Sequence, residues 1–134
     1  MGLDQTMIVA GVGCRRGAPA SDVEAAIRAA LARANVAASA LDAVATIATK
    51  SAEAGIRATA EKLGVALVAV SEAEIKAATD RIETRSARVL MLIGVPAVAE
   101  AAALAAAGPA ARLITPRLMM GAATCALAAS GVAP

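Results

Sequence analysis

Short apolar runs rich in β-branched residues alternate with amphipathic segments along this sequence of 134 residues, and this alternation constrains the fold more than any other feature. The apolar runs are typical of buried strands, and the segments between them have helical periodicity. Strands that are joined by helices pair in parallel, and the helices cover both faces of the sheet. We therefore expect an α/β fold with three layers, in which a mostly parallel sheet of five to six strands lies between helices. The length fits one domain over residues 1–134.

The expected strands and helices follow one another in a regular order. The expected strands are Met7–Gly11, Leu41–Ala48, Val65–Val70, Val89–Ile93, Arg112–Thr115 and Gly121–Ala129. The expected helices run from Ser21 to about residue 34, over Ala52–Leu63, from Ser71 to about Thr79, and over Ala97–Ala107. No helix separates the last two strands, so the last one can be an antiparallel strand at an edge. The sequences Ser21–Glu24 and Ser71–Glu74 both have the pattern of a capping box, which predicts helix starts at the two serines.

The composition excludes several functions, because the chain contains no histidine and no aromatic residue. Without histidine there is no Ser-His-Asp triad and no histidine ligand for zinc or haem. Without aromatic rings no nucleic-acid base can stack on the protein, and the net charge of +2 is too small to indicate a DNA-binding surface. We expect no metal ion, no cofactor and no nucleic-acid partner. Most of the basic residues are arginines, which favours bidentate binding of carboxylate or phosphate, although GC-rich codons give the same bias.

No segment of the sequence is typical of a signal peptide or a membrane span. The apolar run Met7–Ala10 is short and no basic region precedes it. The longest run without charges, Leu118–Pro134, is shorter than the roughly 20 residues that a membrane span requires. Cys14 and Cys125 lie far apart and form no C-x-x-C pair. We therefore expect a cytoplasmic protein with reduced thiols and no membrane partner.

Basic and small residues gather at the expected turns between strands and helices. In a parallel sheet all such turns lie along one edge, and ligands bind there. These turns contain Gly13, Cys14, Arg15, Arg16, Lys50, Ser51, Ser71 and Gly94. Arg117 can reach the same edge if the loop after the fifth strand folds back. The helices that begin there add free N–H groups and the positive end of the helix dipole, so we predict a site for an anion with several carboxylates or phosphates.

The first turn does not match a nucleotide-binding motif. The pattern G-x-G-x-x-G requires glycine where Arg16 stands, and no Gly-Lys-Ser/Thr follows for a P-loop. We interpret Arg15 and Arg16 as anion-binding residues rather than solvated ones. Lys50 is interpreted equally well as a second cation of the site or as a surface residue.

Catalysis has only weak candidates, which are Cys14, Lys50 and Glu53. No histidine can act as a base for Cys14, so a small residue packed under the turn is the simpler interpretation. Glu53 and Glu100 lie near helix starts, where we expect them to complement the helix dipole. We expect Met119 and Met120 to fill the core rather than to contact a ligand.

Four segments match the motifs of a known family, in the order that the family shows. They are Gly11–Gly17 (GVGCRRG), Ala45–Gly55 (ATIATKSAEAG), Gly94–Leu104 (GVPAVAEAAAL) and Gly121–Ala128 (GAATCALA). The first is similar to G-[IV]-G-C-R-[RK]-G and the third to G-V-x-x-V-A-E-A-A-A-L, and these two are the more specific. The chain thus resembles the CobE/CbiG C-terminal family of cobalamin biosynthesis, and is most like its stand-alone CobE members.

The resemblance implies a cytoplasmic protein of corrin-ring synthesis. Its ligand would be a modified tetrapyrrole that carries acetate and propionate groups, and such carboxylates fit the arginines of the predicted site. The longer CbiG members are hydrolases that open a ring-derived lactone, and they have N-terminal regions that this sequence does not show. Arg117 stands where the family commonly has lysine.

Two functions stay open at this point, and a third ranks last. The first is a protein that binds an anionic corrin intermediate, and holds it or hands it on, without a reaction of its own. The second is a hydrolase or isomerase that acts on a precorrin. The third is a structural partner of other enzymes of the pathway, which fits poorly with a surface that lacks aromatic anchors.

Overall fold

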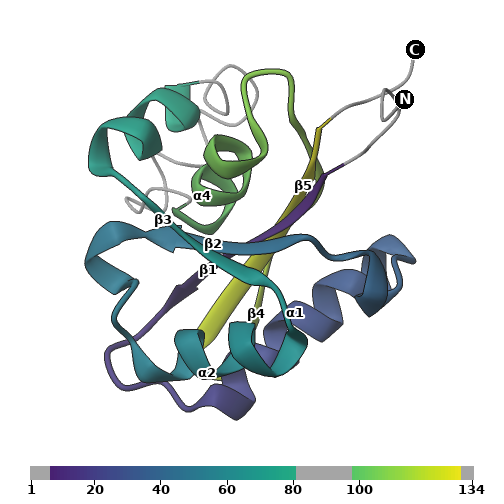
Figure 1. The fold of residues 1–134 in the computed structure, drawn as a ribbon, viewed down its shortest axis with the longest axis vertical. Helices are drawn as coiled ribbons and strands as arrows, with labels where there is room; N and C mark the ends of the chain where they lie inside the picture. The colour runs from purple at the N-terminus through teal and green to yellow at the C-terminus, as the bar shows by residue number, and fades with distance from the viewer. Residues whose placement is uncertain (1–6, 81–97, 131–134) are drawn as a thin grey trace.

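A five-stranded sheet separates two layers of helices in the computed structural model, which describes residues 7–80 and 98–130 (Figure 1). The strands are β1 (Ile8–Cys14), β2 (Ala43–Ile47), β3 (Ala66–Val70), β4 (Arg112–Met120) and β5 (Ala123–Ala129). The main helices are α1 (Ala20–Ala34), α2 (Ala54–Leu63) and α4 (Val98–Ala107). A further helix covers 72–80, and two short 3-10 helices are η1 (Ala38–Ala40) and η2 (Ala48–Lys50). The predicted three-layer α/β fold is confirmed, while the predicted strand over 89–93 lies outside the described residues.

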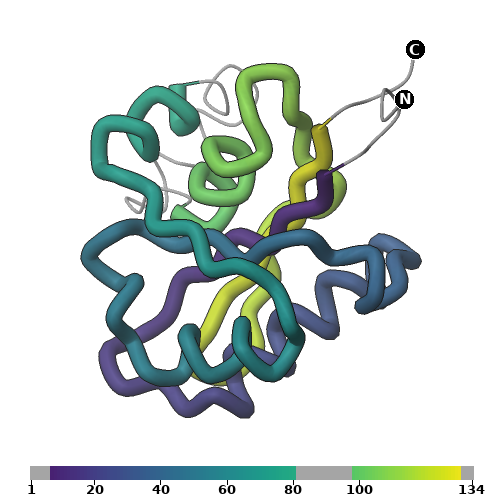
Figure 2. The backbone as a smooth tube through the Cα atoms, in the orientation of Figure 1, coloured from purple at the N-terminus to yellow at the C-terminus, as the bar shows by residue number. Residues whose placement is uncertain are grey.

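The strands of the sheet lie in the order β3-β2-β1-β5-β4. β1, β2 and β3 pair in parallel, whereas β5 is antiparallel to both β1 and β4. Figure 2 shows that β1 and β5, from opposite ends of the chain, run side by side. The last strand is therefore antiparallel, as predicted, but it lies inside the described sheet and β4 forms its edge. The burial of the two strands agrees with these positions, because β5 is buried along almost its whole length while β4 is largely exposed.

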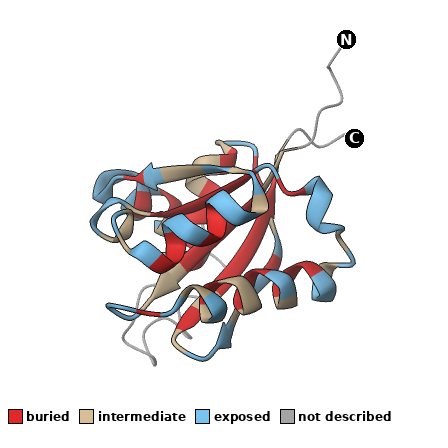
Figure 3. Ribbon diagram, turned by 60° about the horizontal axis from the view of Figure 1, so that its bottom comes forward, coloured by how far each residue is buried: buried red, intermediate tan, exposed pale blue. Residues whose placement is uncertain are grey.

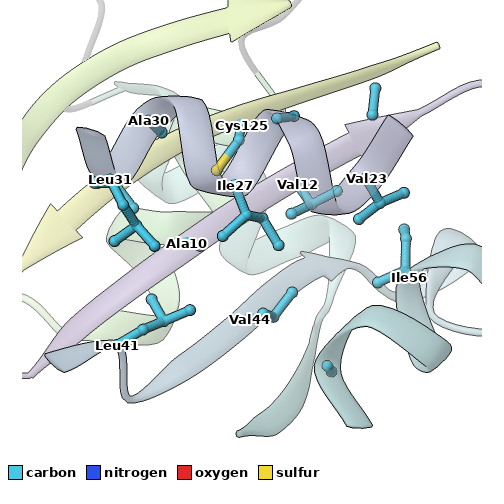
Figure 4. Packing of buried hydrophobic residues seen from close by; sticks show 14 residues of the cluster. Ala10, Val12, Val23, Ile27, Ala30, Leu31, Leu41, Val44, Ile56 and Cys125 are labelled. Carbon is cyan, nitrogen blue, oxygen red and sulfur yellow. The ribbon is translucent and has the colours of Figure 1, made fainter. Parts of the chain in front are cut away.

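One face of the sheet is covered by α1 and α2. The predicted stripe of Val23, Ile27 and Leu31 on α1 is buried against it. Figure 4 shows Ile27 over Val12 and Cys125, which come from the neighbouring strands β1 and β5. Figure 3 shows the same pattern over the described residues, with buried residues along the sheet and on the helix faces toward it.

The other face is covered by α4, in which seven of ten residues are alanine, and by the helix over 72–80. A Cβ atom on Gly11 of β1 would collide with the backbone of α4 at Ala99 and Ala103. The helix thus lies unusually close to the sheet, because neither surface carries a large side chain at the contact. This close contact fixes the beginning of α4 over β1.

The two predicted capping boxes have different outcomes. At the second one, Ser71 N–H donates to Glu74 Oε1 at 3.0 Å, and Glu74 N–H donates to Ser71 Oγ at 3.1 Å. The first one is wrong, because α1 begins at Ala20 with Pro19 as N-cap and without a side-chain cap. Pro19 already has the extended conformation that an N-cap requires. Glu24, the other end of the predicted box, instead accepts hydrogen bonds from Arg28 and Lys62, at 2.7 Å and 2.9 Å.

The predicted end of the fifth strand at Thr115 is also wrong, because β4 continues to Met120. Its pairing with β5 is irregular on both sides of Thr115, and Pro116 lies in the second irregular step. Proline is tolerated here because β4 is the edge of the described sheet. Met119 is 70% exposed and Met120 is 40% exposed, so neither fills the core. No helix among the described residues has the length and apolarity to cross a bilayer.

Candidate ligand-binding pocket

A pocket of about 360 Å³ lies at the carboxyl end of β1, between the β4–β5 turn and the beginning of α4. Its volume falls in the range of sites that bind small molecules. The pocket is lined by Gly13, Cys14, Arg15, Val98, Ala99, Arg117, Met119, Gly121, Ala122, Ala123 and Thr124. Four residues of the predicted anion site therefore lie together, namely Gly13, Cys14, Arg15 and Arg117.

Arg15 reaches the pocket because the pairing of β1 with β5 continues one step beyond the strand. Arg15 N–H donates to the carbonyl oxygen of Ala122 at 3.0 Å, next to the pair of Cys14 and Ala123. The Arg15 carbonyl then accepts from Ala18 N–H at 3.0 Å, which turns the chain toward α1. The side chain of Arg15 is exposed and lies at the rim of the pocket.

Arg117 reaches the pocket from the edge strand β4, not from a folded-back loop. Its backbone N–H donates to Glu100 Oε2 at 3.1 Å, a hydrogen bond between β4 and the first turn of α4. Glu100 therefore does more than complement the helix dipole. The carboxyl end of β4 lies at the same edge as that of β1, because both strands are antiparallel to β5.

The lining combines two positive groups with small apolar side chains. Within the described part of the chain, neither Arg15 nor Arg117 forms an ion pair, and no carboxylate side chain lines the pocket. Thr124 Oγ1 donates to the carbonyl oxygen of Gly13 at 3.3 Å. A Cβ atom on Gly13 would lie 3.0 Å from that hydroxyl oxygen, so glycine keeps this wall open. Such a lining suits an anion attached to an apolar body.

The other described residues of the predicted site do not line this pocket. Arg16 is exposed in the same loop as Arg15 but does not line the pocket. Lys50 and Ser51 follow β2, where Ser51 Oγ donates to the Ala48 carbonyl at 2.7 Å. Ser71 caps the helix over 72–80. Gly94 lies outside the described residues.

The sequence interpretation missed the wall that the β4–β5 turn supplies. Gly121, Ala122, Ala123 and Thr124 all line the pocket. The sequence pattern predicts these residues in a last strand and does not place them at the ligand edge. The sequence holds only part of the signal: no helix separates the last two strands, so the turn between them lies at the carboxyl end of the first. That this end lies beside the carboxyl end of β1 depends on the pairing of β5 with β1.

Of the three weak catalytic candidates, only Cys14 lines the pocket. Burial raises the pKa of the Cys14 thiol above its ordinary 9.0, and the Glu53 carboxylate raises that pKa further, while Lys50 opposes them. Glu53 Oε1 accepts a hydrogen bond from Gly17 N–H at 2.9 Å, and neither Glu53 nor Lys50 lines the pocket. Cys125 is fully buried, which raises the pKa of its thiol to about 12. Among the described residues, no three acidic or cysteine side chains gather as a metal site requires.

The fold and the pocket define a small three-layer α/β protein with an arginine-lined pocket at the carboxyl edge of its sheet. Residues 8–128 match the family model described as "Cobalamin synthesis G C-terminus". The chain belongs to this family, and the resemblance inferred from the four motifs is confirmed. It is accordingly a cobalamin biosynthesis protein of the CobE/CbiG C-terminal type.

Individual relatives agree with this assignment. "Protein CobE" of Sinorhizobium sp. is 37% identical over 121 residues, which are 90% of this chain and 79% of that protein. The crystal structure of cobalamin biosynthesis protein chiG from Agrobacterium tumefaciens is 42% identical with a TM-score of 0.73, over 91% of this chain and 97% of that one. The crystal structure of CobE, a protein from the cobalamin biosynthetic pathway, is 34% identical with a TM-score of 0.78, over 92% and 90%.

Proposed function

We propose that the pocket binds a corrin-ring intermediate of cobalamin biosynthesis through the carboxylates of that intermediate, and that the protein holds or hands on this ligand in the cytoplasm. The observation that carries the proposal is the meeting of Arg15 and Arg117, from segments 102 positions apart in the sequence, at one pocket. Guanidinium groups bind carboxylates in a bidentate manner. Handing on the ligand would bring the protein into contact with other enzymes of the pathway.

The apolar part of the lining supports a ligand with an apolar body. Val98, Ala99 and Ala123 offer small side chains, and Met119 adds a long flexible one that is 70% exposed. Methionine adapts to irregular apolar surfaces. The pocket is small for a whole tetrapyrrole, so a carboxylate-bearing edge would enter it and the rest of the ring would lie over Met119.

The alternative, a hydrolase or isomerase that acts on a precorrin, has less support. General acid or base catalysis requires a titratable group within hydrogen-bond reach of the substrate. Among the described residues that line the pocket, the titratable side chains are two arginines and the Cys14 thiol, whose pKa is raised. Turnover of a precorrin by the isolated protein would favour the enzyme over the binding protein.

An absorbance titration tests the binding proposal directly. The protein has no aromatic residue, so all near-ultraviolet and visible absorbance belongs to the ligand. The probes are cobyrinic acid, a corrin with free carboxylates, and cobinamide, whose corresponding side chains are amides. We expect spectral change and heat release with cobyrinic acid at micromolar protein, and much weaker binding of cobinamide. Equal binding of both probes, or no binding of either, would contradict the proposal.

Charge-removing variants locate the binding site. Arg15→Gln and Arg117→Gln each remove one guanidinium from the pocket, so we expect both to weaken the binding of cobyrinic acid. Arg33→Gln is the matched control, because Arg33 is exposed in the last turn of α1, away from the Arg15 loop at the start of that helix. An equal loss in all three variants would show that net charge, not the pocket, determines binding.

A further inference from the structure

The β4–β5 turn is held at Ala122 through both of its backbone groups. Ala122 N–H donates to Asp22 Oδ2 at 2.9 Å, and the Ala122 carbonyl accepts from Arg15 N–H at 3.0 Å. Asp22 lies in the first turn of α1 and is 100 positions away from Ala122 in the sequence. The neighbouring Gly121 has a φ of 60°, and a Cβ atom there would collide with the Asp22 carboxylate. The Asp22 carboxylate thus joins α1 to the turn that forms a wall of the pocket, and the Ala122 carbonyl joins that turn to the Arg15 loop.

A second carboxylate holds the segment that carries the other arginine. Pro116 has no N–H, and the pairing of β4 with β5 is irregular between Thr115 and Leu118. Arg117 N–H lies within this irregular step and donates to Glu100 Oε2, at 3.1 Å. Glu100 is partly buried in the first turn of α4, next to the pocket-lining residue Ala99. The carboxylate therefore fixes the backbone from which the Arg117 side chain extends.

Both carboxylates accept from backbone N–H groups beside the arginines, Glu100 from Arg117 itself and Asp22 from Ala122, whose carbonyl accepts from Arg15 N–H. In the described part of the chain neither Asp22 nor Glu100 forms an ion pair. An ion pair between one of these carboxylates and a guanidinium would neutralise a positive charge of the site. Because the carboxylates bind the backbone instead, both guanidinium groups stay available to an external anion.

We propose that Asp22 and Glu100 are positioning residues, whose carboxylates hold the backbone of the pocket so that Arg15 and Arg117 bind one polycarboxylate ligand together. This inference rests on the proposed function. It predicts an effect opposite to that of simple electrostatics. A negative charge near an anion site weakens binding, so its removal strengthens binding by charge alone. If the carboxylates act by holding the backbone, removal of the acceptor weakens binding instead.

The amide and alanine variants separate these two effects. Glu100→Gln and Asp22→Asn remove the charge but keep an oxygen that accepts the hydrogen bond, whereas Glu100→Ala and Asp22→Ala remove both. We expect each alanine variant to bind cobyrinic acid about tenfold more weakly than the wild type, as the loss of a hydrogen bond to a charged group implies. We expect each amide variant to bind as tightly as the wild type or more tightly.

Glu72→Ala and Glu72→Gln are the matched controls. Glu72 is an exposed carboxylate at the start of the helix over 72–80, and it does not line the pocket. We expect both control variants to bind cobyrinic acid like the wild type. Alanine variants of Asp22 and Glu100 that bind as tightly as the wild type would overturn the inference. Amide variants that lose as much affinity as the alanine variants would overturn it as well.

Amide hydrogen exchange provides a readout that needs no ligand. We expect the Arg117 amide to exchange about tenfold faster in Glu100→Ala than in the wild type, and to keep its protection in Glu100→Gln. The Ala122 amide should show the same contrast between Asp22→Ala and Asp22→Asn. Unchanged exchange in the alanine variants would refute the positioning role whatever the binding data show. The expected exchange pattern in a protein that binds no cobyrinic acid would refute the proposed function and keep the backbone role alone.

Discussion

Gly11 of β1 lies so close to α4 that a Cβ atom on it would collide with the carbonyl oxygen of Ala99. The same added atom would lie 2.8 Å from the Cβ of Ala103, so two turns of the helix contact this one position of the strand. Alanine and glycine make such a close approach possible, since larger side chains would separate the layers. The abundance of alanine in this chain therefore has a structural consequence, which is the position of α4 over β1 and beside the pocket.

Gly11→Ala should lower the free energy of unfolding by about 1–3 kcal/mol, because the added methyl group forces α4 away from the sheet. Gly13→Ala is the control in the same strand, since among the described residues its Cβ would meet only the Thr124 hydroxyl, at 3.0 Å. That variant should lose less stability, because a hydroxyl group can rotate away. Urea unfolding followed by far-ultraviolet circular dichroism measures both. Equal stability of Gly11→Ala and the wild type would show that the helix does not lie this close.

The binding of cobyrinic acid should weaken as the salt concentration rises, since exposed charges are screened beyond about 10 Å at 0.1 M salt. Arg15 is exposed and Arg117 is partly buried, so screening should act mainly on Arg15. In Arg15→Gln the affinity should therefore depend less on salt than in the wild type. Calorimetric titrations at several salt concentrations measure this slope. A salt-independent affinity in the wild type would mean that the ligand is held without its charges.

Local sequence patterns predicted most of the helices and strands. They failed where another residue took the position or the partner that the pattern required. The capping box at Ser71 forms as expected, but the one at Ser21 does not, since Pro19 already supplies the extended N-cap. Glu24 of that box is attracted instead by Arg28 and Lys62, and Lys62 lies 38 positions away. No sequence pattern within one helix contains such a distant partner. The parallel direction of β1, β2 and β3 was predictable because each of these strands is followed by a helix.

The candidate site was only half predictable, for a topological reason. Arg15 was found because it follows a strand, and every parallel strand ends at the same edge. The wall of Gly121 and Thr124 was missed because its position depends on β5 pairing with β1, at the other end of the chain. Lys50 is interpreted from the sequence as a second cation of the site or as a surface residue, and the structure places it after β2 without lining the pocket. Strand order, which decides such neighbours, is a long-range property of the chain.

The Cys14 thiol should react slowly with iodoacetamide at neutral pH, because its pKa is raised above 9.0 by burial and by the Glu53 carboxylate. Glu53→Gln removes a cause of the raised pKa and should speed alkylation, whereas Lys50→Gln should slow it. Cys125, with a pKa of about 12, should be alkylated only after unfolding. Mass spectrometry of the native and the urea-treated protein distinguishes the two thiols. Fast modification of native Cys14 at neutral pH would reopen its interpretation as a nucleophile.

Glu24 should make the stability of the protein depend on pH in the acid range. Its hydrogen bond with Lys62, which is the larger cause, and its hydrogen bond with Arg28 hold the pKa of its carboxyl below the ordinary 4.5. These interactions favour the ionised carboxylate in the folded state more than in the unfolded state. The resulting stability is fully present above pH 4.5. It is lost as the pH falls through the lowered pKa, where the carboxylate becomes protonated in the folded protein as well.

Glu24→Gln should accordingly be less stable than the wild type near neutral pH, and this difference should vanish at the acid end of the titration. Lys62→Gln should show part of the same loss, because it removes one of the two cations that bind Glu24. Glu61→Gln, which removes an exposed carboxylate from α2, is the control. Urea unfolding from about pH 7 to about pH 2 measures the four proteins under matched conditions. A constant difference between Glu24→Gln and the wild type over this whole range would show that the glutamate acts through packing, and not through its charge.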